Sequence, residues 1–299
     1  MTTTPALDSP PSGAGSRLAF GAVAFTVVAW ASAFVAIRDL GDDFGPGPLT
    51  LGRLLVAAVV LGALLAARRE WVRPTRQEWT LIGVYGLIWF GVYNVALNAA
   101  EQRVDAGTAA MLVNIGPILI ALLAGTLLRE GYPRWLLIGA GVAFAGAALI
   151  GVATAGEDDA VVLGIVLGVV AAVAYAIGVV AQKPVLRRLP SLQVTWLGCA
   201  VASVACLPYA PALVEESGRA SAGTLGWLVY LGLVPTALAF STWGYALARM
   251  DAGRLGVTTY LVPPLAIVLA WVLLAEAPAP LALAGGAVCL LGVALSRRR

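Results

Sequence analysis

The 299-residue sequence contains no histidine and has few charged residues. Asp, Glu, Lys and Arg make up 12% of it, against about 25% in a soluble domain. Without imidazole there is no histidine metal ligand, no histidine proton relay and no Ser–His or Cys–His nucleophile pair. The composition therefore argues against a soluble enzyme, and it predicts neither a cofactor nor a metal site.

Cysteine and clustered positive charge are also scarce. Cys199, Cys206 and Cys289 lie in apolar runs, which is typical of small buried side chains and not of a disulfide framework. The net charge of +3 is spread over many short segments, so the basic residues form no stripe of the kind that binds nucleic acid. No nucleic-acid partner is expected.

Apolar residues dominate instead, at 60% of the sequence with a mean hydropathy of +0.90. They form long runs, most of them near the roughly 20 residues that cross a bilayer core as a helix. The runs are Leu18–Ile37, Pro48–Ala66, Trp79–Ala100, Ala106–Leu128, Trp135–Thr154, Val161–Ala181, Leu192–Ala210, Gly223–Ala246, Gly253–Ala275 and Leu281–Leu295. The sequence predicts an all-α membrane protein with ten transmembrane helices in the lipid bilayer, after a disordered tail over 1–16.

The second half of the sequence repeats the first. A shift of 146 positions aligns 103–130 with 249–276 without a gap, and Asp105-Ala106-Gly107 then falls on Asp251-Ala252-Gly253. Pro117 coincides with Pro263 and Glu130 with Glu276 in the same register, which compositional bias alone does not produce. We therefore expect a duplication, with one five-helix repeat over 17–154 and a second over 155–299.

Five crossings are an odd number, so the second repeat enters the membrane from the opposite side and the two repeats are inverted. The distribution of positive charge agrees with this topology. Fifteen of the nineteen Lys and Arg residues fall in the tail, the even-numbered loops and the C-terminus. The positive-inside rule then predicts that both termini are cytoplasmic and that the protein lies in the cell inner (plasma) membrane.

Inverted repeats favour secondary transport by alternating access, because two equivalent halves can exchange inward-open and outward-open states around a midplane site. Two other classes stay open at this point. An intramembrane enzyme needs clustered acids, histidines or metal ligands at the membrane surface, and a passive channel needs a continuous polar pore.

The chain resembles the drug/metabolite transporter superfamily, in particular the EamA-type proteins with two five-helix repeats. The resemblance rests on the paired segments 103–130 and 249–276. Arg53, early in the second span, also matches an arginine that is usual there in the family. Within the superfamily the chain is most similar to the YddG-type amino-acid exporters. The resemblance implies export of small metabolites, most of all amino acids including aromatic ones, with other metabolites or drugs as the alternative.

Aromatic and amide side chains within the spans are the candidate substrate-binding residues. Tyr85, Trp89 and Tyr93 follow one another at four-residue steps and so share a helix face. Amides at membrane depth are costly unless they face protein or water. The full set is Trp30, Ser32, Tyr85, Trp89, Tyr93, Asn94, Asn98, Asn114, Tyr175, Trp243, Thr259 and Tyr260.

Proline and one arginine complete the expected site. Pro117 and Pro263 lie in the middle of related spans, where they are expected to kink the helices and free backbone carbonyls for substrate. The alternative role of these prolines is helix bending for packing. Arg53 lies inside a span and is expected either to contact a substrate carboxylate or to extend toward the membrane surface and nearby acids.

The expected spans hold no acidic residue in their interior. An exporter of cationic drugs that exchanges protons needs such a carboxylate, so a zwitterionic substrate fits better and facilitated diffusion is expected. The glycine runs of spans five and ten, among them Gly139, Gly146 and Gly292, predict close helix packing and leave a homodimer contact through these two spans open.

Overall fold

The computed structural model describes residues 13–104, 109, 112–154, 161–274, 280–296 and 298, and the regular structure of these residues is entirely helical. The first half contains α1 (Gly13–Leu40), α2 (Pro46–Arg68), α3 (Arg76–Val84), the π-helix η1 (Tyr85–Tyr93), α4 (Asn94–Glu101), α6 (Gly116–Leu127) and α7 (Arg134–Thr154). Most of the expected tail lies outside these residues. Asp105-Ala106-Gly107 and Glu276 lie outside them too.

The second half follows the same plan with shorter pieces. It contains α8 (Val161–Val185), α9 (Ser191–Ala205), the 3₁₀-helix η2 (Leu207–Tyr209), α10 (Ala210–Arg219), α11 (Ala222–Leu231), the π-helix η3 (Gly232–Leu238), α12 (Ala239–Leu247), α13 (Ala252–Val257), the 3₁₀-helix η4 (Thr258–Leu261), α14 (Val262–Leu274) and α15 (Pro280–Ser296).

Six helices in the described part of the chain are long and apolar enough to cross a membrane, and a seventh crossing is formed if α9 and the bent segment after it count as one. Shorter apolar helices at Gly116–Leu127, Arg134–Gly146 and Leu283–Ser296 occupy the three remaining expected spans. The all-α membrane architecture is confirmed. The number of ten spans stays a prediction.

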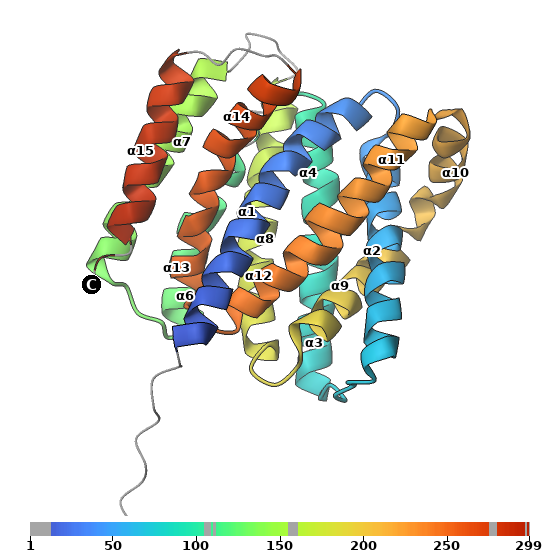
Figure 1. Ribbon diagram of the computed structural model, residues 1–299, viewed down its shortest axis with the longest axis horizontal. Coiled ribbons are helices and arrows are strands. Elements are labelled where there is room, and N and C mark those ends of the chain that lie inside the picture. The colour runs from blue at the N-terminus through green and yellow to red at the C-terminus, as the bar shows by residue number, and fades with distance from the viewer. Residues whose placement is uncertain are drawn as a thin grey trace, which may run out of the picture.

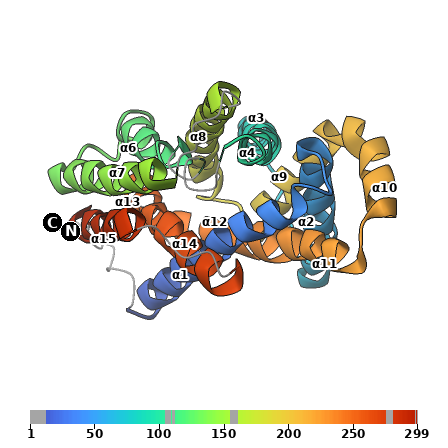
Figure 2. The ribbon, with the colours of Figure 1, turned by 90° about the horizontal axis from the view of Figure 1, so that it is seen from above.

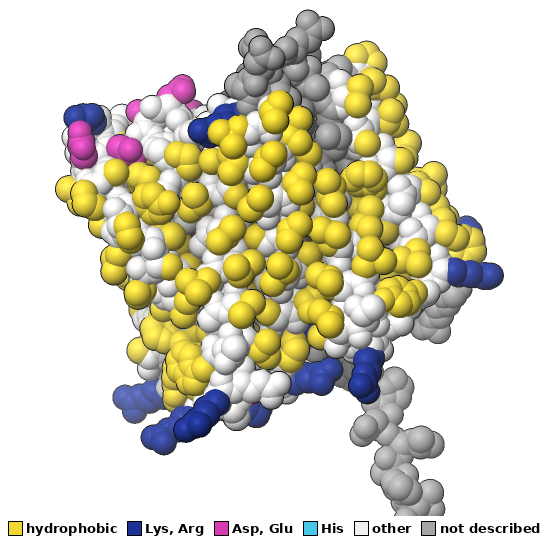
Figure 3. Space-filling model, turned by 180° about the vertical axis from the view of Figure 1, so that it is seen from behind, with side chains coloured by type: hydrophobic (Ala, Val, Ile, Leu, Met, Phe, Trp, Pro, Cys, Tyr) yellow, Lys and Arg dark blue, Asp and Glu magenta, His cyan; other side chains and the backbone are white. Residues whose placement is uncertain are grey.

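Charged side chains separate to two opposite edges of the molecule. In Figure 3, most of the visible Lys and Arg side chains lie toward one edge, here named the basic end, and Asp and Glu gather at the opposite edge, named the acidic end. Hydrophobic side chains cover the broad surface between them. Figure 1 places the start of α1 and the end of α15 at the basic end.

Local sequence signals set the boundaries of the helices. Proline at the first turn of α2 provides a fixed φ where no backbone donor is needed. Thr75 and Glu78 form a reciprocal capping box at the start of α3, with Thr75 N donating to the Glu78 carboxylate at 2.7 Å. Arg69 ends α2 in the left-handed conformation, with φ 54°.

Corresponding π-helices of the two halves each pack on helices of the other half. η1 packs on α8 and α9, whereas η3 packs on α1 and α2. A glycine allows the close approach in each half. A Cβ on Gly86 would lie 2.9 Å from the Gly198 carbonyl oxygen, and one on Gly232 would lie 2.5 Å from Val56 Cβ. Gly86 and Gly232 are 146 positions apart, so the same packing device occurs twice.

α9 and α10 differ from the expected straight span. Sequence analysis predicts one span over Leu192–Ala210, but α9 ends at Ala205 and the chain bends by 57° before the next helical segment. Pro208 and Pro211 explain the break, because each lacks a backbone donor and clashes with the preceding turn. α10 lies at the far edge of the bundle in Figures 1 and 2.

α7 and α15 form a close pair at the opposite edge of the bundle (Figures 1 and 2). A Cβ on Gly139 would lie 2.4 Å from Ser296 N, and one on Gly146 would lie 2.5 Å from Cys289 N. The glycine faces of the expected spans five and ten are therefore buried against each other within one chain. A homodimer through α7 and α15 would use their opposite faces, and it stays a prediction.

This packing is tested by adding one methyl group. A Cβ on Gly292 would lie 2.3 Å from Ala143 N, so we expect Gly292→Ala to push α7 and α15 apart and to cost about 1–3 kcal/mol of stability. Thermal unfolding in detergent measures the loss. Gly141→Ala on α7 is the matched control, since no atom lies within 4 Å of its added Cβ. Equal midpoints for both variants would contradict the packing.

Candidate functional site

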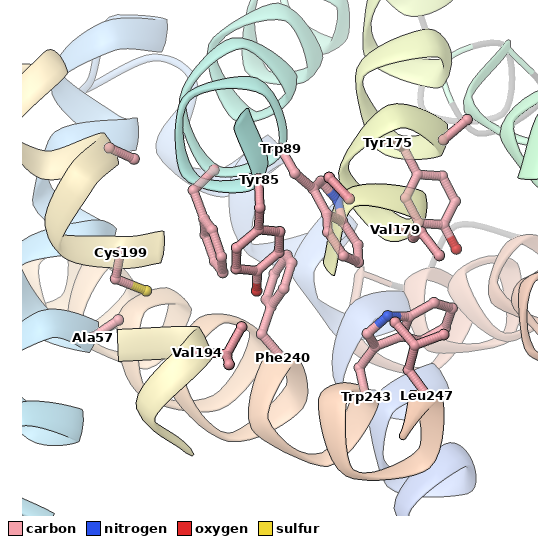
Figure 4. Packing of buried hydrophobic residues seen from close by; sticks show 14 of the residues in the cluster. Ala57, Tyr85, Trp89, Tyr175, Val179, Val194, Cys199, Phe240, Trp243 and Leu247 are labelled. Atoms are coloured by element: carbon pink, nitrogen blue, oxygen red, sulfur yellow. The ribbon is translucent and has the colours of Figure 1, made fainter. Parts of the chain in front are cut away.

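Aromatic rings from both halves meet in the middle of the bundle. The central aromatic cluster consists of Trp30, Tyr85, Trp89, Phe90, Tyr93, Tyr175, Phe240 and Trp243. Trp30 on α1 lies among the others, with its ring centroid 5.0 Å from that of Trp243 and 5.3 Å from that of Phe240. Figure 4 shows Trp89 and Tyr175 facing Phe240 and Trp243 across this cluster.

A cavity of about 60 Å³ lies beside the cluster and is named the central cavity. This volume exceeds the ~10–15 Å³ that a single water molecule needs. The lining residues are Trp30, Ala33, Phe34, Ile37, Arg53, Trp89, Tyr93, Asn94, Leu97, Val113, Asn114, Tyr175, Phe240, Thr259 and Val262. Its wall is mostly apolar and aromatic, with a few polar groups from different helices, which is typical of a small-molecule site.

Arg53 is the charged group of this lining. Its guanidinium is buried, and Nε donates to Thr236 Oγ1 at 2.9 Å. Thr236 Oγ1 donates in turn to the Leu231 carbonyl at 2.7 Å, which fixes the hydroxyl. No carboxylate oxygen of the described residues lies within 4.0 Å of the Arg53 guanidinium. A buried cation with no acidic partner is costly in the membrane interior.

The π-helix η1 lines this cavity with Trp89 and Tyr93. The second π-helix, η3, corresponds to it in the repeat, since η1 covers 85–93 and η3 covers 232–238, and it ends two residues before Phe240 of the cavity wall. A π-helix shifts backbone hydrogen bonds by one residue and often marks a functional site. Side chains hydrogen-bond the backbone of both segments. Asn94 Nδ2 donates to Phe90 O at 2.9 Å and to Trp89 O at 3.3 Å, and Trp30 Nε1 donates to Pro235 O at 3.2 Å.

A larger polar space opens at the acidic end and is named the vestibule. Its volume is about 720 Å³. The lining residues are Ile37, Arg38, Gly41, Asp42, Asp43, Phe44, Gly45, Leu49, Asn98, Glu101, Gln102, Arg103, Val104 and Glu216. Ile37 also lines the central cavity, so the two spaces are neighbours.

Hydrogen bonds tie the helices together at the basic end. Lys183 on α8 donates through Nζ to the Leu247 carbonyl at 2.6 Å and to the Met250 carbonyl. The Glu130 carboxylate accepts from Ala252 N at 2.9 Å and from Gly253 N at 3.2 Å. Glu130, the last residue of the segment 103–130, therefore caps the start of α13. The second Asp-Ala-Gly motif, Asp251-Ala252-Gly253, lies at this start. These contacts link α8 and the end of α6 to the segment between α12 and α13.

The structure brings eight of the sequence-predicted residues to the central cavity. They are Trp30, Arg53, Trp89, Tyr93, Asn94, Asn114, Tyr175 and Thr259. They come from α1, α2, η1, α4, the turn before α6, α8 and η4. Sequences from both repeats thus contribute to one site.

Five other candidates lie elsewhere. Tyr85 and Trp243 are buried in the aromatic cluster beneath the cavity wall. Ser32 bonds with Tyr230 through their hydroxyl groups at 2.6 Å. Tyr260 is buried against α7 and α15, and Asn98 lines the vestibule.

Pro117 and Pro263 each lie just after a segment that is not α-helical. Asn114 and Ile115 form a turn directly before α6, which carries Pro117 in its first turn. The 3₁₀-helix η4 precedes α14, and Pro263 and Pro264 lie in the first turn of that helix. Proline is well suited to a first turn because no intrahelical donor is needed there. Neither proline lines the central cavity.

Sequence reasoning missed two residues that the structure places at these spaces. Phe240 lines the cavity, and the repeat could have identified it because it is 146 positions after Asn94. Glu101 lies one residue beyond the expected third span, yet the helix includes it and its carboxylate oxygens are buried. Asn94, Asn98 and Glu101 follow at helical spacing and share one face.

Metal chemistry has no support among the described residues, because they hold no group of three His, Cys, Asp or Glu side chains that could bind an ion. Cys199, Cys206 and Cys289 are free thiols and buried.

Comparisons with known proteins identify the family. The model of the EamA-like transporter family matches twice, at residues 18–152 and 162–298. The "Probable terminal-alkyne amino-acid exporter" of Streptantibioticus cattleyicolor is 40% identical over 93% of both chains. The "Probable amino-acid metabolite efflux pump" of Salmonella typhimurium is 27% identical over 89% of this chain and 90% of its own length.

Two further comparisons agree. An uncharacterized transporter of Bacillus subtilis is 32% identical over 88% of this chain and 86% of its own length. A solved crystal structure of a protein superposes with a TM-score of 0.76 at 24% identity, covering 95% of this chain and 97% of the other, and so has the same fold. The chain belongs to the EamA-like transporter family, and it is a membrane transporter that exports small metabolites rather than an enzyme.

Proposed function

We propose that this transporter exports amino acids with apolar side chains across the cell inner membrane by alternating access. The observation that carries the proposal is the buried guanidinium of Arg53, which lines an otherwise largely apolar cavity without an acidic partner among the described residues. A substrate carboxylate would supply the missing negative charge. A guanidinium is planar and binds a carboxylate through two parallel hydrogen bonds.

Thr236 prepares Arg53 for this role. The hydrogen bond from Nε to Thr236 fixes one edge of the guanidinium, while its two terminal nitrogens donate no hydrogen bond to a described residue. A fixed donor group loses less side-chain entropy when it binds its ligand. The arrangement therefore supports recognition of a carboxylate by the terminal nitrogens.

The aromatic cluster supports an apolar substrate side chain. Trp30, Trp89, Tyr175 and Phe240 line the central cavity, and such rings contact alkyl, alkynyl and aromatic groups favourably. The names of two relatives, a terminal-alkyne amino-acid exporter and an amino-acid efflux pump, support the same substrate class. Since the cavity of about 60 Å³ is far smaller than the ~300–1,000 Å³ of a usual small-molecule pocket, side chains of its wall must move when an amino acid binds.

The contrast between the two ends supports alternating access. The vestibule leads toward the cavity from the acidic end, while Lys183 and Glu130 hold the basic end closed. This arrangement corresponds to an outward-facing state if the basic end faces the cytoplasm. Export then requires these contacts to open so that substrate can enter from the basic end.

The orientation in the membrane follows from charge. Lys and Arg side chains gather at the basic end, where α1 starts and α15 ends (Figures 1 and 3), and positive residues favour the cytoplasmic side. We therefore assign both termini to the cytoplasm. The symmetric packing of η1 and η3 supports an inverted relation of the two repeats.

Arg53 variants test the substrate assignment. In proteoliposomes of wild-type protein we expect saturable counterflow of L-phenylalanine and L-propargylglycine. Arg53→Met removes the charge, so this exchange should fall roughly thirtyfold or more, the equivalent of ~2 kcal/mol. Thermal unfolding is measured on the same variant, because Arg53 also donates to Thr236 and lies within electrostatic range of the buried Glu101. A destabilised variant with normal exchange would make Arg53 structural.

Lys183 variants test the closure of the basic end. A cysteine in place of Thr259, in a chain without the three native cysteines, reports on the cavity. In vesicles that expose the basic end, Lys183→Met should raise the rate at which this cysteine reacts with an impermeant thiol reagent about tenfold. The variant loses the hydrogen bonds from a charged donor that favour the closed state. Arg187→Met is the control, because that exposed side chain donates no hydrogen bond to a described residue. Equal rates in all proteins would refute the gate.

Two exposed arginines test the orientation. Arg219 lies on α10 at the acidic end, and Arg298 follows α15 at the basic end. In the same cysteine-free background, Arg219→Cys should react with an impermeant thiol reagent in intact cells. Arg298→Cys should react only after the cells are opened. The reverse pattern would invert the assigned topology.

A further inference from the structure

Three buried acceptor atoms on α4 have no hydrogen-bond donor among the described residues. They are Asn98 Oδ1 and both carboxylate oxygens of Glu101. Asn98 Nδ2 donates to Thr50 Oγ1 at 3.0 Å and to Pro46 O at 3.3 Å, so the amide nitrogen is satisfied and the oxygen is the unpaired atom. Asn98 and Glu101 are three residues apart, which places them side by side on one helix face. Both line the vestibule.

Unpaired buried acceptors without a donor in reach indicate a missing donor group. A hydroxyl or an amide would bring acceptors of its own, whereas a primary ammonium has three donors and no acceptor. Three acceptor atoms, two of them the oxygens of the Glu101 carboxylate, therefore match an ammonium group in number and in charge. In the proposed outward-facing state, the exported metabolite leaves through the same vestibule.

The other charged groups around Glu101 have partners or lie further out. The Glu216 carboxylate accepts from Gly45 N at 3.1 Å, and the Asp43 carboxylate accepts from Thr224 Oγ1 at 3.1 Å. Arg103 donates to Ala99 O at 2.6 Å, and Asp42 is exposed at the rim. Arg53 and Arg38 are the cations within electrostatic range of Glu101, but neither forms an ion pair with it within 4.0 Å.

Arg53 lies close to these acceptors. α2 and α4 run antiparallel, and the Asn98–Thr50 hydrogen bond fixes their register. Arg53 is one turn deeper than Thr50, and Glu101 is one turn nearer the acidic end than Asn98. The two α-carbons are therefore about 9 Å apart along the helices, at ~1.5 Å per residue. The long Arg53 side chain shortens the gap between the two charges.

We propose that Asn98 and Glu101 bind the ammonium group of the substrate, while Arg53 holds the carboxylate of the same molecule. This inference rests on the proposed function and names the chemistry that the site selects, a primary α-amino acid. In an α-amino acid the ammonium and carboxylate groups are bonded to the same carbon atom, so one molecule can bridge Arg53 and the α4 face. Carboxylic acids without the amino group then bind only half of the site.

The test compares two ligands that differ in the ammonium group alone. L-Phenylalanine and 3-phenylpropanoate compete for counterflow of labelled phenylalanine in proteoliposomes prepared with potassium salts. We expect the wild type to favour phenylalanine at least tenfold. Glu101→Gln, which keeps the size of the side chain but removes the charge, should bring this ratio close to one. Asp42→Asn removes the same charge from the rim of the vestibule and should leave the ratio unchanged.

A second variant guards against loss of folding. Glu101→Asp keeps the carboxylate but withdraws it by one methylene, so the ratio should fall between those of the wild type and Glu101→Gln. An unchanged ratio in both Glu101 variants, or a wild-type ratio near one, would overturn the ammonium site while leaving amino-acid export intact. Counterflow that requires sodium and loses this requirement in Glu101→Gln would show a metal cation there instead. A wild type that exchanges no amino acid would overturn the proposed function itself.

Discussion

The absence of water in the bilayer core is the constraint on which the rest of this structure depends. Each backbone donor and acceptor in the core must find its partner within the protein, and the two π-helices at the centre depart from the regular helical pattern. The side chains around the cavity respond to this need. Asn94 donates to the carbonyls of Trp89 and Phe90, Thr236 donates to Leu231, and Trp30 donates to Pro235. The polar groups that shape the site thus also stabilise the irregular helices that form it.

The duplicated scaffold is symmetric, but the lining of the site is not. Trp30 and Tyr175 are related by the repeat, and each packs on the π-helix of the other half. Polar residues of the first half, however, align with small or apolar residues of the second. Arg53 aligns with Cys199, Asn98 with Gly244 and Glu101 with Leu247. The first repeat therefore carries the groups proposed to recognise charge, and the aligned positions of the second repeat are small or apolar. Changes in the second repeat can alter the preferred side chain without disturbing the charged contacts.

The sequence allowed the fold to be predicted further than the site. Hydropathy predicted the helical membrane architecture, and the register of 146 residues predicted which helices correspond. Local irregularities were beyond this reasoning. Pro208 and Pro211 are compatible with a straight span as well as with a bent one. The structure shows the bend of 57°, with α10 at the edge of the bundle. The π-helices leave no simple mark on periodicity. Phe240 was missed because it is apolar, although the repeat aligns it with Asn94. Glu101 was missed because hydropathy ends a span at the first charge, whereas the helix and its burial continue past it.

The central aromatic cluster has an optical consequence. The indole rings of Trp30, Trp89 and Trp243 have centroids 5.0–6.3 Å apart and are inclined to one another. Transition dipoles at such short separations couple strongly, and their fixed chiral arrangement produces intense bands in the near-ultraviolet circular dichroism spectrum. Any movement of Trp30 that admits substrate changes these separations. The three indoles therefore offer a native chromophore with which occupancy of the central cavity can be followed, if substrate displaces Trp30.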